Sequence, residues 1–509
     1  MIDATPLLRP LAARRLARLA AQDPVAAQRA TLARLLRRAR RTRFGREHGF
    51  AEIGSVEQYQ ARVRLRTYEQ FWTEYWAPAF PHLTDVTWPG AIRTFAQSSG
   101  TTSGATKRIP VSRAMIRANA GAAFDTLAFH LAARPASRLF AGKSLILGGS
   151  TALERLAPGI RAGDLSGIAA ARIPLWARSR AFPPRDLALI GDWERKMAAL
   201  APASLRDDIS SISGTPSWML LFFEQLAALH PERPRRLAAF YPRLDLVVHG
   251  GVAFAPYADS MAAWLEGSAA ETREVYAASE GFIAAADRGP GEGLRAIVDR
   301  GLFLEFVRPD ELQSPHPDRR WIATAETGVE YALVLTTNSG LWSYVIGDTV
   351  TLLSLDPPRL LVTGRTAFTL SVVGEHVIAA ELDQAVAEAA RTVGATVADY
   401  AAIPIHPTPT RPRAGHLFVL ELAPARPGTE PQLAAAIDAA LLRLNADYAA
   451  HRQGGFGMLP PEVRLLPPGA FAAWMQSRGK LGGQNKVPRV INDPALLASL
   501  LDLAPGYPR

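Results

Sequence analysis

The sequence predicts an α/β protein in which a large N-terminal domain, with α/β sheets and a barrel-like β region, precedes a smaller α+β domain. Three observations predict this class. Short apolar runs that end in glycines alternate with helical stretches, which is typical of a largely parallel sheet. From about residue 294 the pattern changes to successive strands split by turns, and after Gly374 to helix, strand, strand, helix, strand. At 509 residues the chain is long enough for more than one domain, and we expect the boundary between residues 1–365 and 366–509.

The first fifty residues are strongly basic. They hold twelve arginines against Asp3, Asp23 and Glu47, so this segment carries +9 of the formal net charge of +10. Leucines recur there at near-helical spacing, which predicts one or two amphipathic helices in residues 1–43. A basic helix can lie on nucleic acid or an anionic surface, but the leucines favour a helix packed on the domain with a solvated basic face. These leucines are Leu11, Leu16, Leu19, Leu32, Leu35 and Leu36.

Further elements follow from periodicity and turn signals. Aromatic residues are dense over residues 55–88, which predicts core or a pocket wall. The N-terminal domain is expected to have strands at 91–97, 143–149 and 244–251, and helices at 111–130, 185–200, 216–230 and 256–266. The β-rich region is expected to have strands at 295–307, 321–326, 329–337, 342–352 and 359–363. The small domain is expected to have helices at 377–392 and 430–450, strands at 400–406, 415–422 and 462–466, and a joint at 364–375.

Residues 98–107 read Ser-Ser-Gly-Thr-Thr-Ser-Gly-Ala-Thr-Lys and form the most informative stretch of the chain. Glycines let the backbone N–H groups approach a ligand, hydroxyls add donors, and Lys107 adds a positive charge. This chemistry suits a loop that holds a polyphosphate, in a strand–loop–helix setting. The spacing differs from the Walker A loop, because the glycines are one residue too close and Ala105-Thr106 precedes the lysine. A Ser/Thr-rich turn is the alternative.

Lysine is rare, although it is normally a common residue. A chain that uses arginine elsewhere is expected to keep lysine where a compact point charge is required. Lys107 and the pair near the C-terminus stand out for this reason. The five lysines are Lys107, Lys143, Lys196, Lys480 and Lys486.

Composition excludes several classes of site. The chain has no cysteine, which excludes disulfides, thiolate zinc sites and a cysteine nucleophile. It has no run of 18 or more apolar residues, so we expect no membrane span. The N-terminus shows no signal-peptide pattern. We expect a cytoplasmic protein that is a monomer or a weak dimer.

Four short motifs follow the loop. Tyr276-Ala-Ala-Ser279-Glu280-Gly comes after a predicted strand, and Tyr344-Val-Ile-Gly-Asp348 lies in the β-rich region. Thr363-Gly-Arg365 opens the joint, and Gln484-Asn-Lys486-Val-Pro-Arg489 lies near the end. Each motif alone is typical of ordinary core, capping or loop residues.

Together, in this order, the motifs resemble the adenylate-forming superfamily. Within it the chain resembles the acyl-acid amido synthetases first known as auxin-responsive proteins of plants. That family carries Ser-Ser-Gly-Thr-Thr-Ser-Gly-x-x-Lys, matched at 98–107, and Tyr-x-x-Ser-Glu, matched at 276–280. It also carries Tyr-Arg-x-Gly-Asp, matched at 344–348 except that Val345 replaces the arginine. The resemblance extends from about residue 44 to 490.

The resemblance implies a ligase that uses ATP and Mg²⁺ and has a mobile small domain. A carboxylic acid attacks the α-phosphorus of ATP, and an amine, usually of an amino acid, then takes the acyl group from the acyl-adenylate. Tyr276 is expected to stack on adenine, Glu280 to hold Mg²⁺ and Asp348 to bind the ribose. Arg365 is expected to reach the ribose or a phosphate. Lys486 is expected to reach the α-phosphate, with Lys480 as the alternative. The other ATP-binding residues expected are Ser98, Ser99, Gly100, Thr101, Thr102, Lys107 and Ser279, and the acyl pocket is expected to include Trp218, Gly251 and Val252.

Two other functions remain open at this point. A ligase of the same fold with a thiol acceptor, coenzyme A or a carrier protein, shares the first step and every nucleotide residue. A non-enzymatic nucleic-acid-binding protein would use the basic N-terminus, but this does not explain the loop at 98–107, and the rest of the chain is close to neutral. The sequence does not identify the acid or the amine.

Overall fold

The computed structural model describes most of the chain, and the structural statements below refer to these residues. The described residues are 2–98, 107–148, 153–173, 178–190, 193–251, 254–312, 314–366, 370, 372, 375, 377–405, 413–445, 448–449, 452, 458–479, 486–491 and 493–502.

The chain folds as two compact units, each with its own hydrophobic core. Unit 1 consists of Met1–Thr215, Phe222–Gly251 and Leu265–Val362. Unit 2 consists of Thr363–Arg509 together with Pro216–Leu221 and Val252–Trp264. The mixed α/β class predicted from the sequence is confirmed, and the domain boundary at 365/366 stays a prediction.

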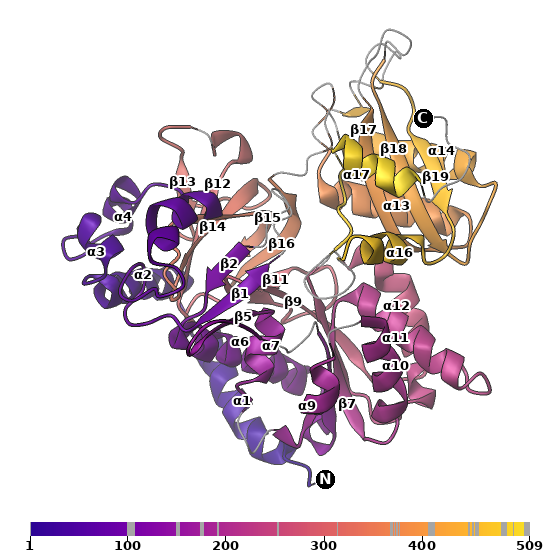
Figure 1. The fold of residues 1–509 in the computed structure, drawn as a ribbon, viewed down its shortest axis with the longest axis horizontal. Coiled ribbons are helices and arrows are strands. Elements are labelled where there is room, and N and C mark those ends of the chain that lie inside the picture. The colour runs from indigo at the N-terminus through magenta and orange to yellow at the C-terminus, as the bar shows by residue number, and fades with distance from the viewer. Residues whose placement is uncertain are drawn as a thin grey trace. The chain divides into compact units, whose positions relative to one another are not determined.

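The basic N-terminal segment forms two helices in unit 1. Asp23 caps the second helix, because its carboxylate accepts hydrogen bonds from two backbone N–H groups of the first turn. The leucines of that helix are buried as predicted, but Leu11 of the first helix is 55% exposed, so the prediction for this residue was wrong. Helix α1 lies along α6 (Figure 1), and Arg15 joins the two helices through Asp125 at 2.8 Å. The helices of this part are α1 (Thr5–Ala20), α2 (Pro24–Ala39), α3 (Arg43–Glu47), α4 (Val56–Arg62), α5 (Tyr68–Phe71) and α6 (Arg113–Ala133).

A four-stranded sheet carries the loop that the sequence singled out. Its strand order is β2-β1-β5-β4, with β1 and β2 antiparallel and β1 and β5 parallel. The strands are β1 (Thr94–Ser98), β2 (Lys107–Pro110), β4 (Glu154–Ala157) and β5 (Ile160–Gly163).

A second sheet of unit 1 has twelve strands in the order β13-β12-β14-β15-β16-β11-β10-β9-β8-β7-β3-β6. The pairs from β6 to β9 are parallel, and the pairs from β9 to β11 and from β12 to β15 are antiparallel. The strands after residue 294 therefore continue the parallel sheet. The strands are β3 (Lys143–Leu147), β6 (Ala181–Phe182), β7 (Ile209–Gly214), β8 (Leu246–Gly250), β9 (Glu271–Ala278), β10 (Gly281–Ala285), β11 (Leu294–Ala296), β12 (Leu302–Val307), β13 (Arg319–Trp321), β14 (Glu330–Thr337), β15 (Tyr344–Leu355) and β16 (Pro358–Arg365).

Further helices follow α6 along the chain, and unit 2 contains a three-stranded sheet. Its strand order is β17-β18-β19, with the first pair antiparallel and the second parallel. The remaining helices before residue 363 are α7 (Leu165–Ala170), α9 (Arg185–Ala188), α10 (Trp193–Ser204), α11 (Pro216–Leu229) and α12 (Ala258–Leu265). After residue 363 the elements are α13 (Ala379–Thr392), β17 (Thr396–Ile405), β18 (Gly415–Ala423), α14 (Glu430–Leu444), β19 (Glu462–Leu466), α16 (Ala470–Ser477) and α17 (Pro494–Leu501).

Several predicted boundaries were wrong for local reasons. The strand expected at 295–307 is split into β11 and β12, and Gly301 lies in the intervening turn with φ +81°. The strand expected at 321–326 ends at Trp321, whose carbonyl oxygen accepts the Thr324 N–H in a turn. The helix expected to reach residue 450 ends at Leu444, because the Asn445 side chain accepts the Tyr448 N–H instead.

Candidate functional site

The loop at 98–107 joins two strands that pair with each other. Ser98 and Lys107 are register partners in the β1–β2 hairpin, so the backbone positions at both ends of the loop are fixed. Ser99, Gly100, Thr101 and Thr102 lie outside the described residues. The expected strand–loop–helix setting was wrong, because the short strand β2 follows the loop and α6 begins only at Arg113.

Lys107 faces an aromatic and acidic environment on unit 1. Its Nζ lies 5.4 Å from the ring centre of Tyr68 and 4.0 Å from Oε1 of Glu69. The Tyr68 hydroxyl accepts the backbone N–H of Arg108 at 2.8 Å, which fixes this ring beside β2. The aromatic segment 55–88 is mainly core, as predicted, and through Tyr68 it also reaches the site.

The motif at 276–281 occupies the hairpin between β9 and β10. Ala278 pairs with Gly281, so Ser279 and Glu280 form the two-residue connection, and both are buried. Tyr276 lies within β9 and is also buried. A hairpin loop that buries a carboxylate is unfavourable unless the carboxylate finds partners.

The motif at 344–348 supplies those partners from β15. The Tyr344 hydroxyl donates to Oε1 of Glu280 at 3.1 Å, and the Tyr276 hydroxyl donates to Oδ2 of Asp348 at 2.5 Å. Gly347 has φ +92°, and the register of β15 against β14 shifts at this point. Glycine suits this backbone, because side-chain-bearing residues rarely adopt it. The bulge thus explains the glycine of the motif.

The electrostatics of the site centre on Glu280. Burial raises the pKa of this carboxyl above its ordinary value, and the nearby Asp348 carboxylate raises it further. The Tyr344 hydroxyl and the Lys107 ammonium act in the opposite direction. The structure thus places the Lys107 and Asp348 charges within reach of Glu280, and Tyr276 on Asp348. It adds Tyr344, which the motif contained but the sequence analysis did not select. The roles expected for these residues stay predictions.

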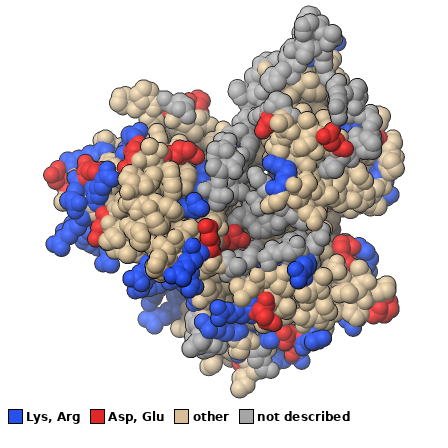
Figure 2. All heavy atoms as spheres, viewed as in Figure 1, with Lys and Arg blue, Asp and Glu red and all other residues tan. Residues whose placement is uncertain are grey.

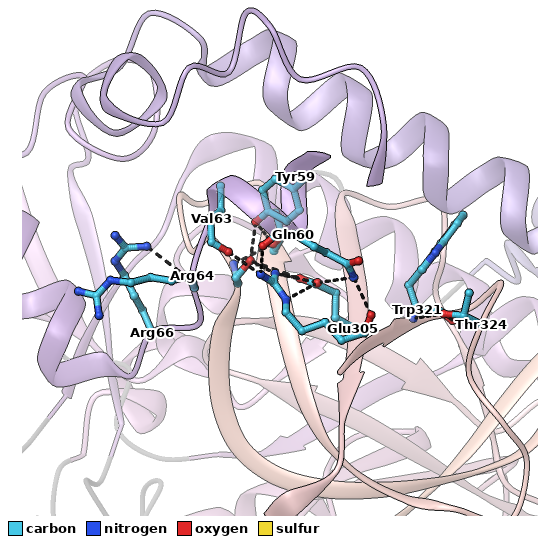
Figure 3. A network of polar contacts seen from close by, with 11 residues as sticks. Tyr59, Gln60, Val63, Arg64, Arg66, Glu305, Trp321 and Thr324 are labelled. Carbon is cyan, nitrogen blue, oxygen red and sulfur yellow. Dashed lines mark hydrogen bonds and ion pairs between the residues drawn. The ribbon is translucent and has the colours of Figure 1, made fainter. Parts of the chain in front are cut away.

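A buried polar network that includes Tyr59 and Glu305 (Figure 3) holds Ser343, the residue before Tyr344 in the chain. Arg319 binds Glu305 at 2.8 Å, and both side chains are almost completely buried. Arg319 also donates to the Ser343 hydroxyl at 2.6 Å, and that hydroxyl donates to Tyr59 at 2.9 Å. Ser343 has the unusual φ of +48°, so these bonds stabilise the backbone turn that directly precedes Tyr344.

The joint predicted at 364–375 contains a second buried carboxylate, on unit 2. Glu375 is fully buried and accepts hydrogen bonds from the Val372 N–H at 2.8 Å and from Nε2 of His416 at 2.7 Å. Leu370 and Val377 pair as an isolated antiparallel bridge around it. Arg365 is the last residue of β16.

Lys486 is exposed on unit 2, and Lys480 lies outside the described residues. The anchor of its motif is Arg489, which sequence reasoning missed. Arg489 lies 4.4 Å from the ring centre of Tyr400, donates to the Tyr400 carbonyl oxygen at 2.9 Å and lies 3.5 Å from the Asp383 carboxylate. The final arginine of the motif is therefore a structural residue that fixes the backbone near Lys486.

Two of the three expected acyl-pocket residues lie in the described part of the chain. Trp218 is half-buried in the first turn of α11, and Gly251 follows β8 with φ +85°. Val252 lies outside the described residues. Neither Trp218 nor Gly251 takes part in the hydrogen bonds that join Tyr276 to Asp348 and Tyr344 to Glu280.

No helix among the described residues is long and apolar enough to cross a bilayer. The described residues also contain no group of three or more potential metal-binding side chains among His, Cys, Asp and Glu.

Comparison with known proteins gives consistent results. Three family models match: the GH3 family N-terminal domain at residues 14–200, the central domain at 295–365 and the C-terminal domain at 380–495. The chain is 29% identical over 278 residues, or 51% of its length, to indole-3-acetic acid-amido synthetase GH3.8 of Oryza sativa subsp. indica. It is 26% identical over 338 residues, or 62% of its length, to probable indole-3-acetic acid-amido synthetase GH3.4 of Oryza sativa subsp. japonica. The chain spans about half the length of these relatives, 45% and 51% respectively.

Solved structures agree with the fold. The GH3.15 acyl acid amido synthetase superposes with a TM-score of 0.80 at 18% identity, covering 99% of this chain and 97% of that one. A 2-hydroxyisobutyryl-CoA ligase in the postadenylation state superposes with a TM-score of 0.64 at 17% identity, covering 95% and 92%. Since the models of all three GH3 domains match in order along most of the sequence, the chain belongs to the GH3 family.

Proposed function

We propose that the protein joins a carboxylic acid to an amine, with an amino acid as the expected amine, at the expense of ATP. Family membership supports this proposal, since the relatives named above are amido synthetases. The observation that carries it is the arrangement of two hydroxyl–carboxylate pairs, Tyr276 with Asp348 and Tyr344 with Glu280. Both Asp348 and Lys107 act electrostatically on Glu280.

In the first step, a carboxylate oxygen of the acid attacks the α-phosphorus of ATP. A new P–O bond forms, the bond to the β-phosphate oxygen breaks, and pyrophosphate leaves with the electron pair. Both reactants are anionic, so positive charge and hydrogen-bond donors near the phosphates lower the barrier. We assign this role to Lys107 and to the loop residues Ser98, Ser99, Gly100, Thr101 and Thr102.

The purine and ribose are assigned to the hydroxyl–carboxylate pair on β9 and β15. The Tyr276 hydroxyl is held by Asp348 at 2.5 Å, so the ring that is proposed to stack on adenine is fixed before the nucleotide binds. Asp348 would accept hydrogen bonds from the ribose hydroxyls, and Ser279 lies in the adjoining turn. A fixed ring loses little conformational entropy on binding.

Glu280 has the chemistry of a Mg²⁺ ligand. Mg²⁺ prefers oxygen donors and is usually held by one or two carboxylates together with substrate phosphates. When bound, Mg²⁺ would neutralise phosphate charge. Glu280 would then stay ionised despite its burial, because a cation reverses the effect of desolvation.

In the second step, the amine nitrogen attacks the acyl carbonyl carbon. A C–N bond forms, the C–O bond to AMP breaks, and the nitrogen loses a proton to solvent.

Two further cations are assigned to the nucleotide. Lys486, or Lys480 in its place, is proposed to contact the α-phosphate of ATP in the first step. Arg365 is proposed to contact the ribose or a phosphate. A thiol ligase is the second candidate, because solved structures of both ligase classes share this fold; family membership favours the amine.

The first experiment measures exchange of labelled pyrophosphate into ATP across a library of carboxylic acids. We expect acid-dependent exchange in wild type and a loss of at least 100-fold in Glu280→Gln. The matched control Glu292→Gln, an exposed carboxylate outside the site, should keep wild-type exchange. Equal exchange in Glu280→Gln and wild type would remove Glu280 from the proposed site, and no exchange with any acid would argue against adenylation.

The acceptor is tested separately. With an acid that supports exchange, AMP release is measured with amino acids and with coenzyme A. Release that depends on an amino acid, with an amide identified by mass spectrometry, is expected. A thioester and no amide would establish the thiol alternative.

A further inference from the structure

Unit 1 contains a pocket that the proposed reaction does not use. Its volume is about 820 Å³, and its wall comes from the end of α2, the first turns of α6 and the turn before β12. Trp88 and Asn338 contribute buried side chains to this wall. Lys107, Tyr276, Glu280 and Asp348 are not part of it.

Arginines dominate the lining. Five of them come from the end of α2 and the turn after it: Arg34, Arg37, Arg38, Arg40 and Arg41. Arg117 of α6 and Arg300 bring two more. Among the lining residues that the structure describes, the one acidic side chain is Asp299, which Arg15 already binds at 2.7 Å.

Most of these arginines have no counter-charge within the described part of the chain. Arg300 is paired with Asp125 at 2.7 Å, and Arg34 donates to the Thr31 hydroxyl at 3.2 Å. The side chains of the other lining arginines make no hydrogen bond or ion pair with any described residue. These are Arg37, Arg38, Arg40, Arg41 and Arg117.

Helix stability explains only part of this arrangement. Cations in the last turn of a helix are favourable, which accounts for Arg37 and Arg38. Arg117 lies in the second turn of α6, and the first turn of that helix has no acidic residue to offset its charge. Arg37 and Arg41 line the same pocket with the same sign of charge, which is unfavourable when no anion lies between them. The arrangement is therefore electrostatically unfavourable without an anion.

We propose that this arginine pocket binds a small oligophosphate, a molecule that carries two or more phosphate groups. The volume lies in the range typical of small-molecule sites. Guanidinium groups match phosphate oxygens in geometry as well as charge. One phosphate carries about −1.5 to −2 near pH 7, which balances only a fraction of the lining, so several phosphates are required.

The distribution of charge favours a small ligand over nucleic acid. Lys and Arg side chains gather over the N-terminal helices, at the left of Figure 2, whereas the chain after residue 50 is nearly neutral in sum. A nucleic acid would need an extended basic surface, because its phosphates continue beyond any pocket. The inference is independent of the proposed reaction, since no residue of the candidate nucleotide site lines the pocket.

The test is calorimetric titration of the full chain with inorganic tripolyphosphate. The Lys107→Ala variant serves as background, so that the loop at 98–107 contributes less binding. In this background, Arg37→Gln/Arg41→Gln is compared with Arg14→Gln/Arg18→Gln. Arg14 and Arg18 are exposed on α1, lie outside the pocket and make no ion pair with a described residue.

We expect tripolyphosphate binding to weaken at least tenfold in Arg37→Gln/Arg41→Gln and less than twofold in Arg14→Gln/Arg18→Gln. Only the first variant loses contacts to phosphate. Arg117→Gln, on a different helix, should also weaken binding, and it carries the test if the α2 variant fails to fold. Equal weakening by both pairs, no effect of Arg117→Gln, or no binding in the Lys107→Ala background would overturn the proposal. Tighter binding of a 20-base-pair duplex than of tripolyphosphate, lost in the same variants, would assign the arginines to nucleic acid instead. Pyrophosphate exchange, measured in parallel without the Lys107 substitution, should be unchanged in Arg37→Gln/Arg41→Gln.

Discussion

Glu274 lies on β9, two residues before Tyr276, and is a half-buried acid for which the proposed reaction has no role. Burial alone raises its pKa from 4.5 to about 7. No described residue hydrogen-bonds its carboxylate. In the unfolded chain this group ionises near pH 4.5, but in the folded protein it stays protonated up to about pH 7. The unfolded state therefore binds fewer protons between these values, and folding stability falls as the pH rises through this window.

The size of the effect follows from the shift in pKa. About 2.5 units correspond to about 3 kcal/mol of lost stability above pH 7, of which about 1 kcal/mol is already lost at pH 5.5. Glu274→Gln removes the ionisation while keeping the shape of the side chain. We expect its stability relative to wild type to be about 2 kcal/mol higher at pH 8 than at pH 5.5.

The assay is urea denaturation of wild type, Glu274→Gln and the exposed control Glu292→Gln at both pH values. Comparing the two pH values cancels any constant difference between an amide and a carboxylic acid. The control should show the same difference from wild type at both pH values, within about 0.5 kcal/mol. If Glu274→Gln also shows the same difference at both pH values, burial does not keep this carboxyl protonated and the reasoning is wrong.

Three further changes test the support of the site. Tyr344→Phe removes the hydrogen-bond donor to Glu280, so the pKa of that carboxyl should rise. The acid limb of the pH profile of pyrophosphate exchange should then move to higher pH. An unmoved limb would contradict the role of Tyr344 in stabilising ionised Glu280. Glu305→Gln leaves Arg319 as a buried charge without its partner and should lower the free energy of unfolding by about 3–5 kcal/mol, measured in urea; a loss under about 1 kcal/mol would mean that the network relaxes. Gly347→Ala places a β-carbon at φ +92° and should lower stability by about 1–2 kcal/mol and slow exchange; unchanged values of both would show that the bulge is not required.

The predictable parts of the fold are those with strong local patterns. The apolar runs at 143–149 and 244–251 correspond to β3 and β8, and the amphipathic pattern at 377–392 to α13. Strand β2 was missed because four residues ending in proline carry little periodicity, and its pairing with β1 is what defines it. The short helices α16 and α17 were missed for a similar reason, since eight residues give barely two turns.

The motifs predicted which residues belong to the site. They did not predict which side chains contact one another, because those contacts depend on the fold. Glu280 and Asp348 were selected from motifs. That Tyr344 binds Glu280 and Tyr276 binds Asp348 depends instead on how β9 pairs with β10 and on the bulge in β15. Arg319 lies in no motif at all. Its role depends on a contact with Ser343, 24 residues later in the chain, and sequence patterns do not reveal such contacts.

The charges of the proposed nucleotide site on unit 1 bear on how a nucleotide would enter it. Glu280 and Asp348, when ionised, outnumber Lys107, and the loop from Ser99 to Thr106 contains no charged residue. The unit 1 part of the proposed site would therefore repel a free nucleoside triphosphate, whereas Arg365 and Lys486, assigned to the nucleotide from unit 2, would act in the opposite direction. Burial is the main cause of the raised pKa of Glu280, and the Asp348 carboxylate adds to it. A site of this composition is suited to a nucleotide that arrives with a divalent cation, because the carboxylate that is unfavourable in the empty site then becomes a ligand.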